Sequence, residues 1–385
     1  MSDAVSTAFL EGQGVPVALG DVEAELIRLW GPAATEVGGD TDGSPAVTRV
    51  VLANLIVECL DDSSRIAGVL ETVMSRYPCR AIVLCRDDSL DRQIQAEASA
   101  LCHLPAPGCP QVCSERIVLR TGRNAHDLLM GAVRPLIEPD LPLILWWTSA
   151  PTTLPELYRD LSSECSRVIL DLPDNAPAGA LALGLDRSIH SFSRDSIWFE
   201  ITGWRELVAQ LFDPSCLAGL LGQIAQVSIE VVAPAVAGPP RPGVWLAAWL
   251  AGQLGWRPVG AATFGSVGPD SRLSASFESP GGPVTVVLVA RPSPALSEPR
   301  IASVIITCRD PGGESTLKLT RPSPLSPGVR IDVTSPEACR LPRVVDSPDP
   351  DPAQRIAAAL DSARIDPPFD RALPIAMGML GLESD

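Results

Sequence analysis

Two hydrophobic periods alternate along the chain between residue 46 and about residue 171. Short apolar runs predict strands, and apolar residues at helical spacing lie between several of these runs. The runs are AVTRVVLANLIVEC, RAIVLC, LPLILWW and RVILD, and one helical stripe consists of Ile66, Val69, Leu70 and Val73. LPLILWW is continuously apolar, which is typical of a strand covered on both faces. This alternation predicts an α/β fold with a mostly parallel sheet covered by helices.

Three further segments complete this half of the chain. QIQAEASALCHL fits either a helix or an alternating strand, and we favour a strand that forms a hairpin with CSERIVLR across the turn PAPGCP. WRELVAQLFDP predicts a helix that ends at Asp-Pro. Near the N-terminus, the helical spacing of Val22, Leu26, Leu29 and Trp30 predicts one amphipathic helix within an arm.

The segment APAVAGPPRPG is the clearest linker, because its prolines fit neither a helix interior nor a central strand. Beyond it, VWLAAWLAGQLGW predicts a buried helix, and a last helix is expected around residues 353–363. The alternating segments between them, RLSASFE, VTVVLVA, IASVIITC, TLKLT and VRIDV, predict antiparallel strands. We therefore expect an arm (1–45), an α/β domain (46–232), a linker (233–242) and a smaller α+β domain with an antiparallel sheet (243–385).

Charge and composition narrow the functional classes. The 385 residues carry a net charge of −16, and Lys318 is the only lysine, so nucleic acid and anionic membrane surfaces are disfavoured partners. The N-terminus has no export signal, and no apolar segment is long enough to span a membrane, so a cytoplasmic location is expected. The ten cysteines are then expected to be mostly reduced and buried.

Common catalytic motifs are missing from the sequence. There is no phosphate-binding loop, no dinucleotide GxGxxG, no HExxH and no GxSxG, so we predict no catalytic residue, no cofactor and no metal. Cys102, His103, Cys109 and Cys113 gather within a short segment, but their gaps are irregular for a zinc site. Inert packing is the first interpretation, and a redox role for Cys102, Cys109 and Cys113 is the alternative.

Tryptophans close to strand ends are the candidate binding residues. Trp146 and Trp147 point to opposite faces of their strand, so one is expected in the core and the other, with Trp147 favoured, near an interface. Trp198, Trp204 and Arg205 fit core packing with a salt bridge, but their composition is also typical of an interface hot spot.

One acidic residue is a candidate for ligand binding. Asp171 ends RVILD, at the carboxyl end of an expected parallel strand, where open α/β sheets bind ligands. The equal alternative is a turn in which the Asp171 carboxylate caps local backbone amides.

The order of these segments resembles the glucose-6-phosphate dehydrogenase assembly protein family, OpcA. The resemblance is carried by DVEAELIRLW, YPCRAIVL, CSERIVL, DLPLILWW, RVILD, WFEITGWRELVAQLFD and VWLAAWLAGQLGW. The stretch that is His-Pro-Ser-Arg in the family is Tyr77-Pro78-Cys79-Arg80 here, so only Pro78 and Arg80 match.

The resemblance implies a non-catalytic partner that binds glucose-6-phosphate dehydrogenase and favours its active oligomer in the oxidative pentose phosphate pathway. It also implies a link to redox control, with thioredoxin as a second candidate partner. We predict that a face with Trp146, Trp147, Trp198 and Trp204 binds the dehydrogenase, and that Arg80 and Arg205 form charge pairs at its rim. Two alternatives stay open: an α/β enzyme or metabolite-binding protein that uses Asp171 on a small phosphorylated or sugar substrate, and a scaffold for a different partner.

Overall fold

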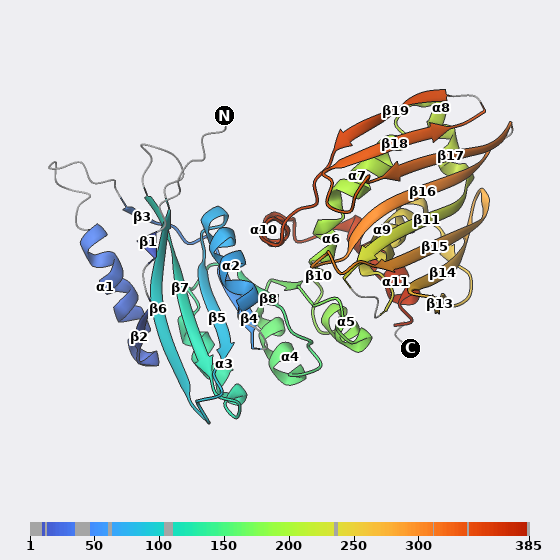
Figure 1. The fold of residues 1–385 in the computed structure, drawn as a ribbon. Helices are drawn as coiled ribbons and strands as arrows, with labels where there is room; N and C mark the ends of the chain where they lie inside the picture. Colours follow the sequence, from blue (N-terminus) through green and yellow to red (C-terminus); the bar gives the residue numbers. More distant parts are fainter. Residues whose placement is uncertain are drawn as a thin grey trace. The chain divides into compact units, whose positions relative to one another are not determined.

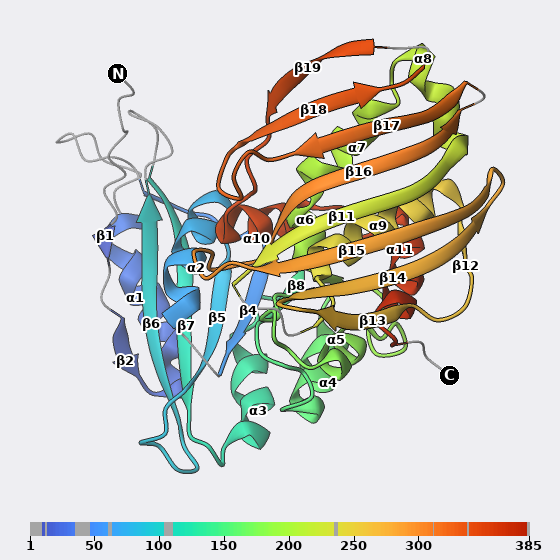
Figure 2. The same cartoon turned by 45° about the vertical axis from the view of Figure 1, so that its right-hand side comes forward.

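The structure, a computed structural model, describes residues 10–11, 14–34, 47–60, 64–103, 111–234, 238–310, 312–336 and 339–382. The chain forms two compact units, each built on one β-sheet (Figures 1 and 2). Unit 1 comprises Met1–Pro173, Leu183–Asp195 and Pro352–Arg364. Unit 2 comprises Asp174–Ala182, Ser196–Asp351 and Ile365–Asp385.

The sheet of unit 1 contains ten strands within the described residues, in the order β1-β6-β7-β5-β4-β8-β9-β10, with β2 beside β6 and β3 beside β7. The strands are β1 (Leu10–Glu11), β2 (Val15–Val17), β3 (Val47–Arg49), β4 (Asn54–Cys59), β5 (Arg80–Arg86), β6 (Ile94–His103), β7 (Gln111–Thr121), β8 (Leu143–Trp147), β9 (Arg167–Leu170) and β10 (Ser193–Asp195). The helices are α1 (Val22–Ala34), α2 (Ser64–Arg76), α3 (Leu129–Val133), α4 (Pro155–Glu164) and α10 (Pro352–Asp361), together with the short 3-10 helices Leu19–Asp21, His126–Leu128 and Arg134–Leu136. Helix α5 (Ala178–Leu185) is divided between the units: its residues up to Ala182 belong to unit 2, and those from Leu183 belong to unit 1.

Strands β7, β5, β4, β8, β9 and β10 are mutually parallel. Numbered by their order in the chain, they lie in the spatial order 3-2-1-4-5-6, the doubly wound arrangement in which ligands bind where the order reverses. That switch point lies between β4 and β8. Strand β6 is antiparallel to β7, which confirms the predicted hairpin.

Hydrophobic burial explains why the central strands form. Every residue of NLIVEC in β4 and of LILWW in β8 is buried, as expected for strands covered on both faces. Helix α1 packs on β6 and buries Val22 and Leu26, while α2 packs against α10. The predicted α/β fold with a mostly parallel sheet is confirmed.

Unit 2 has nine strands in the part of the chain that is described, in the order β12-β14-β15-β11-β16-β17-β18-β19, with β13 beside β14. They are β11 (Ile224–Ala233), β12 (Arg257–Pro258), β13 (Thr263–Val267), β14 (Asp270–Ser279), β15 (Gly282–Pro292), β16 (Arg300–Asp310), β17 (Gly313–Thr320), β18 (Gly328–Thr334) and β19 (Cys339–Asp346). The helices are α6 (Ile197–Glu200), α7 (Thr202–Leu211), α8 (Ser215–Ala218), α9 (Arg241–Leu254) and α11 (Pro367–Met379), with a 3-10 helix at Gly219–Gln223.

The second sheet is largely antiparallel, as predicted, apart from the parallel pair β11–β15. Its strands alternate between buried and exposed residues: in β14, Leu273, Ala275 and Phe277 are buried while Arg272 and Ser276 are exposed. Helix α9 packs on β11, β15 and β16, and α6, α7 and α11 pack on α9, so these helices lie on one side of the sheet (Figure 2).

Several elements lie in different units from those that the sequence predicts. Helix α7 (WRELVAQLFDP), together with α6 and α8, was expected in the α/β domain but belongs to unit 2. Helix α1, expected in a separate arm, belongs to unit 1, where it packs on β6. Strand β11, expected at the end of the α/β domain, pairs with β15 and β16 in the middle of the second sheet. Helix α10, expected to close the second domain, belongs to unit 1, where it packs on α2. The boundaries 46–232 and 243–385 therefore differ from the division that the contacts show, because the local pattern of a strand or helix does not specify the partner on which it packs.

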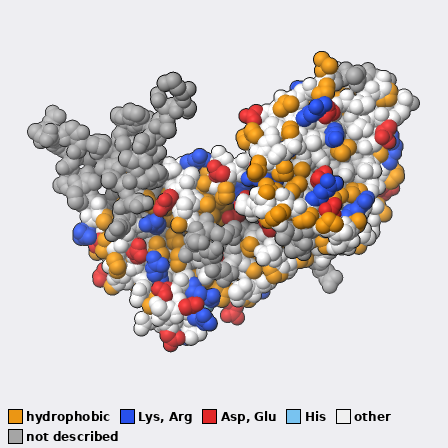
Figure 3. Space-filling model, in the orientation of Figure 1, with side chains coloured by type: hydrophobic (Ala, Val, Ile, Leu, Met, Phe, Trp, Pro, Cys, Tyr) orange, Lys and Arg blue, Asp and Glu red, His pale blue; other side chains and the backbone are white. Residues whose placement is uncertain are grey.

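The surface carries charges of both signs. On the face shown in Figure 3, Lys and Arg side chains are interspersed with Asp and Glu side chains. Within the described residues, none of the helices is both long enough and apolar enough to cross a membrane.

Candidate functional site

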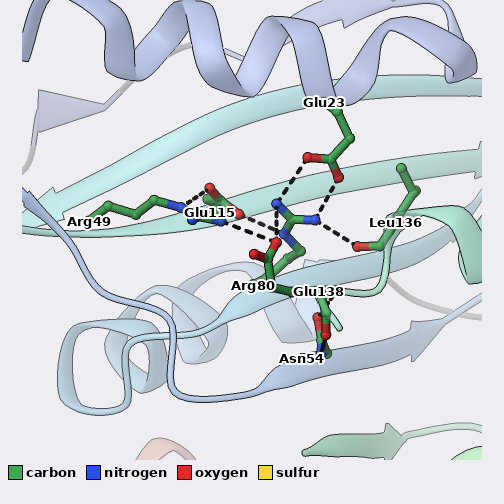
Figure 4. Close-up of polar contacts among 7 residues, drawn as sticks. All are labelled: Glu23, Arg49, Asn54, Arg80, Glu115, Leu136 and Glu138. Carbon is green, nitrogen blue, oxygen red and sulfur yellow. Dashed lines mark hydrogen bonds and ion pairs between the residues drawn. The ribbon is translucent and has the colours of Figure 1, made fainter. Parts of the chain in front are cut away.

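A buried ion-pair network lies at the amino ends of the parallel strands of unit 1 (Figure 4). Arg80, the first residue of β5, is 2% exposed, and its Nε donates to Glu115 Oε2 at 2.6 Å. Its Nη1 donates to Glu23 Oε1 at 2.6 Å and to the carbonyl oxygen of Leu136 at 3.0 Å. Nη2 lies 3.0 Å from Glu138 Oε2. One guanidinium therefore joins α1, β5, β7 and the loop before β8.

Glu115 is the acidic centre of this network. Its side chain is 1% exposed, and its second oxygen accepts a hydrogen bond from Arg49 Nε at 2.7 Å. Asn54 holds the neighbouring loop, because its Nδ2 donates to the Glu138 carbonyl at 2.9 Å and its Oδ1 accepts from the Glu138 backbone N–H at 2.8 Å. A buried charge needs such partners, so the network defines the conformation of this edge.

The network makes the stability of unit 1 depend on pH. Burial by itself raises the pKa of Glu115, but hydrogen bonds and charges from Arg49 and Arg80 outweigh burial and hold the pKa below its usual value. The ionised carboxylate therefore contributes stability above the unfolded pKa of about 4.3, and this contribution is lost as pH falls through the lower folded pKa. We expect acid unfolding followed by circular dichroism to show a shallower pH dependence in Glu115→Gln than in the wild type. Equal slopes would contradict this role of Glu115.

Arg80 does not lie at the rim of an exposed face. It starts β5, whereas Trp147 ends the parallel strand β8, so the two residues lie at opposite edges of the sheet. Next to Arg80, the Cys79 side chain is fully buried, and burial raises the pKa of its thiol to about 12. The Arg80 guanidinium is used inside the fold, so the predicted rim charge pair at this position is not available in this conformation.

Trp146 and Trp147 are both 0% exposed, and they lie on opposite faces of a strand that is covered on both sides. The Trp147 ring meets Tyr158 of α4 edge-on, with ring centroids 5.1 Å apart. Neither indole N–H has a hydrogen-bond acceptor among the described residues. Both tryptophans are core residues here, so neither side chain forms the exposed interface that we expected of Trp147.

In unit 2, Trp198 is the centre of an aromatic cluster. Its side chain is 1% exposed, and its indole Nε1 donates to Asp366 Oδ2 at 2.9 Å. Phe369 of α11 packs edge-on against the indole at 5.1 Å, and Trp245 of α9 lies 5.9 Å away. Helices α6, α9 and α11 are thereby packed together.

Arg205 lies across this cluster and is only half-buried. Its guanidinium lies 3.9 Å from the centre of the Trp198 ring, and Nη2 donates to the Trp198 carbonyl and to Thr202 Oγ1. Burial lowers the pKa of Arg205 to about 10. Trp204, by contrast, is 2% exposed, and Arg321 lies 5.3 Å over its ring. Of the six predicted partner-binding residues, Arg205 alone retains appreciable exposure, and the role of all six in partner binding stays a prediction.

At the carboxyl edge of unit 1, Asp171 directly follows β9, as predicted, and its backbone N–H donates to the Trp147 carbonyl at 2.9 Å. Sequence reasoning did not single out Glu58, which is 0% exposed near the end of β4. Its Oε1 accepts from the backbone N–H of Leu60 at 3.0 Å. Its Oε2 accepts from the backbone N–H groups of Thr148 and Ser149 at 3.1 and 3.0 Å. The available signal was a single acidic residue inside the apolar run NLIVEC.

Cys102 and Cys113 form a disulfide, which corrects the expectation that the cysteines are reduced. The two residues are directly opposed on the antiparallel strands β6 and β7, so their Cα atoms are 4.0 Å apart. Cys109 lies outside the described residues, and a redox role for the three cysteines stays a prediction. Within the described ranges, no group of His, Cys, Asp and Glu side chains is arranged to hold a metal ion.

Two relatives, each named putative OxPP cycle protein OpcA, are similar to this chain. The protein of Synechococcus elongatus is 28% identical over 267 residues, which cover 65% of this chain and 59% of the relative. The protein of Synechocystis sp. is 30% identical over 198 residues, which cover 50% of this chain and 40% of the relative. The chain thus matches 59% and 40% of the length of these relatives. The solved structure of an oxidoreductase from Sinorhizobium meliloti is similar with a TM-score of 0.49 and 12% identity, covering 86% of this chain and 95% of that chain.

Family comparison covers both halves of the sequence. Residues 70–183 match the family described as the glucose-6-phosphate dehydrogenase subunit N-terminal domain. Residues 193–373 match the corresponding C-terminal domain. With both domains present in order, the chain belongs to the OpcA family of glucose-6-phosphate dehydrogenase assembly proteins.

Proposed function

We propose that this chain is a non-catalytic, cytoplasmic assembly factor that binds glucose-6-phosphate dehydrogenase, favours its active oligomer and so raises its response to substrate. The observation that carries the proposal is the match of both family domains, in order, over residues 70–183 and 193–373. The missing catalytic motifs agree with a regulator that acts by binding. Such a regulator changes activity only through the difference between its affinities for the active and the inactive enzyme.

Titrating purified glucose-6-phosphate dehydrogenase with the full chain tests this function. The rate is measured against glucose 6-phosphate while gel filtration reports the assembly. We expect a lower apparent KM and a larger complex, because binding to the active oligomer shifts the population towards it. A complex without kinetic change would indicate a scaffold. The absence of both a complex and a kinetic change would contradict the proposal. Running the assay with and without dithiothreitol tests whether the disulfide Cys102–Cys113 makes activation depend on redox state. Identical titration curves would reject this dependence.

Arg205 offers the sharpest test of a docking residue in this assay. Its guanidinium is half-buried, and its Nε has no acceptor among the described residues, so the charge costs stability in the isolated chain. We expect Arg205→Met to change the unfolding free energy by less than about 1 kcal/mol, because the methionine stem keeps the contact with Trp198. Binding to the dehydrogenase should weaken at least about 10-fold if a partner carboxylate pairs with Arg205.

The matched control is Arg257→Met, which removes an arginine that is 81% exposed in the same unit. This control should leave both stability and binding unchanged within about 0.5 kcal/mol. Equal binding by the Arg205 and Arg257 variants would remove Arg205 from the interface while leaving the proposed function untouched.

A further inference from the structure

The doubly wound sheet of unit 1 is a fold that commonly binds nicotinamide dinucleotides. In such folds, the pyrophosphate lies at the switch point, on backbone N–H groups that follow the first strand and begin the next helix. The equivalent place here, where such a crevice would lie, is at the carboxyl ends of β4 and β8. The residues at this position therefore decide whether a dinucleotide fits.

Three backbone donors at this switch point are already bonded to a side chain of the same protein. Glu58 lies opposite Trp147 in the β4–β8 pair, so its carboxylate spans the reversal of strand order. One oxygen accepts the N–H of Leu60, just after β4, and the other accepts the N–H groups of Thr148 and Ser149, just after β8. In addition, Thr148 Oγ1 donates to the Glu58 carbonyl at 2.8 Å.

We infer that the Glu58 carboxylate is an internal substitute for a ligand anion and closes this crevice to nicotinamide dinucleotides. A phosphate that entered would have to displace Glu58 from three hydrogen bonds and leave its carboxylate buried without donors, which is costly. Burial raises the pKa of Glu58, and the hydrogen bonds from the three backbone N–H groups and from the Ser149 side chain oppose that rise.

The sequence between β4 and α2 supports the same conclusion. The connection from β4 to α2 contains Cys59-Leu60-Asp61-Asp62-Ser63, without the glycines that let a backbone approach a pyrophosphate. Asp61 and Asp62 lie outside the described residues, but both add negative charge to a segment that would have to attract an anion. The dinucleotide of this fold class therefore does not fit the residues present.

This inference concerns the isolated chain and does not depend on the proposed function. A scaffold for another protein would show the same closed crevice. A negative result in the dehydrogenase assay would therefore leave this inference intact, and a negative result in the experiments below would leave the proposed function intact. If both hold, any activation of a dehydrogenase proceeds without a dinucleotide at this position of the assembly factor.

Titration of the full wild-type chain with NADP+ and NAD+ by calorimetry, and with NADPH by fluorescence, tests the closure directly. We expect no saturable binding tighter than about 1 mM. A dissociation constant below that value would overturn the inference if the Glu58→Gln variant changes this constant, since the ligand would then occupy this crevice. Binding that the variant leaves unchanged would place the dinucleotide elsewhere and would leave the closure at this crevice standing.

Chemical complementation tests the positive part of the inference. Glu58→Ala should lower the melting temperature by roughly 5 to 10 °C, because three buried N–H groups lose their acceptor. Sodium formate, a carboxylate small enough for the vacated space, should recover part of this loss, whereas sodium chloride at the same ionic strength should not.

Glu58→Gln is the matched control for complementation, because its side chain fills the same space and leaves no room for formate. A formate effect confined to Glu58→Ala supports an internal anion. A formate effect of equal size in all three proteins, or in none, contradicts it. If Glu58→Ala does not fold, the wild-type titration decides the closure by itself.

Discussion

Replacing Arg80 by methionine is expected to destabilise unit 1 by about 3–5 kcal/mol, because it breaks a buried ion pair and leaves the other charge behind. The Glu115 carboxylate is 1% exposed and would lose its 2.6 Å partner. The Leu136 carbonyl would also lose a donor, and Glu23 would lose its contact with β5. Urea unfolding measures the change, and hydrogen exchange of the amides in β5 and β7 places it in unit 1.

Two further variants separate the charge from the packing. Arg49→Met should cost less than about 1 kcal/mol, because Arg49 is 41% exposed and Glu115 keeps Arg80. The double variant Arg80→Met/Glu115→Gln should be more stable than Arg80→Met alone, because no buried carboxylate is then left without its Arg80 partner. An Arg80→Met protein as stable as Arg49→Met would contradict a structural role for the network.

Trp147→Ala is expected to cost about 3–5 kcal/mol, since it removes a fully buried indole from a close-packed interior. The lost contacts include the edge-on packing against Tyr158. Trp147→Phe should cost less than about 1.5 kcal/mol, because it keeps an aromatic ring and removes an N–H that has no acceptor among the described residues. Denaturant unfolding of both variants measures the difference, and equal losses would contradict this account.

The same pair of variants decides what Trp147 contributes to binding. Weakened dehydrogenase binding in Trp147→Ala alone would be a consequence of unfolding, because the indole is 0% exposed. Weakened binding in the stable Trp147→Phe variant would instead show that the indole itself supports the surface over β8. The alanine variant alone therefore cannot test a direct contact.

The candidate site was only partly predictable, and the reason is the distance along the chain between the groups that meet. Arg80 could be singled out from YPCRAIVL, but its partners Glu115 and Glu23 are 35 and 57 residues away. Glu58 bonds to backbone groups 90 and 91 residues away. No local pattern of apolar and polar residues contains such pairs, so an arginine in a strand could equally have been a rim charge.

The sequence by itself determined the type of most elements, because helix and strand periodicity are local properties that the order of apolar residues specifies. It also predicted the α/β half with a mostly parallel sheet covered by helices, the hairpin of β6 and β7, and the largely antiparallel second sheet. Only the tertiary structure decided that β11 joins the second sheet, that α10 packs on unit 1, and that Glu58 occupies the switch point. These outcomes depend on which surfaces bury one another and on hydrogen bonds between distant segments. Such contacts contribute to stability only once the chain is folded.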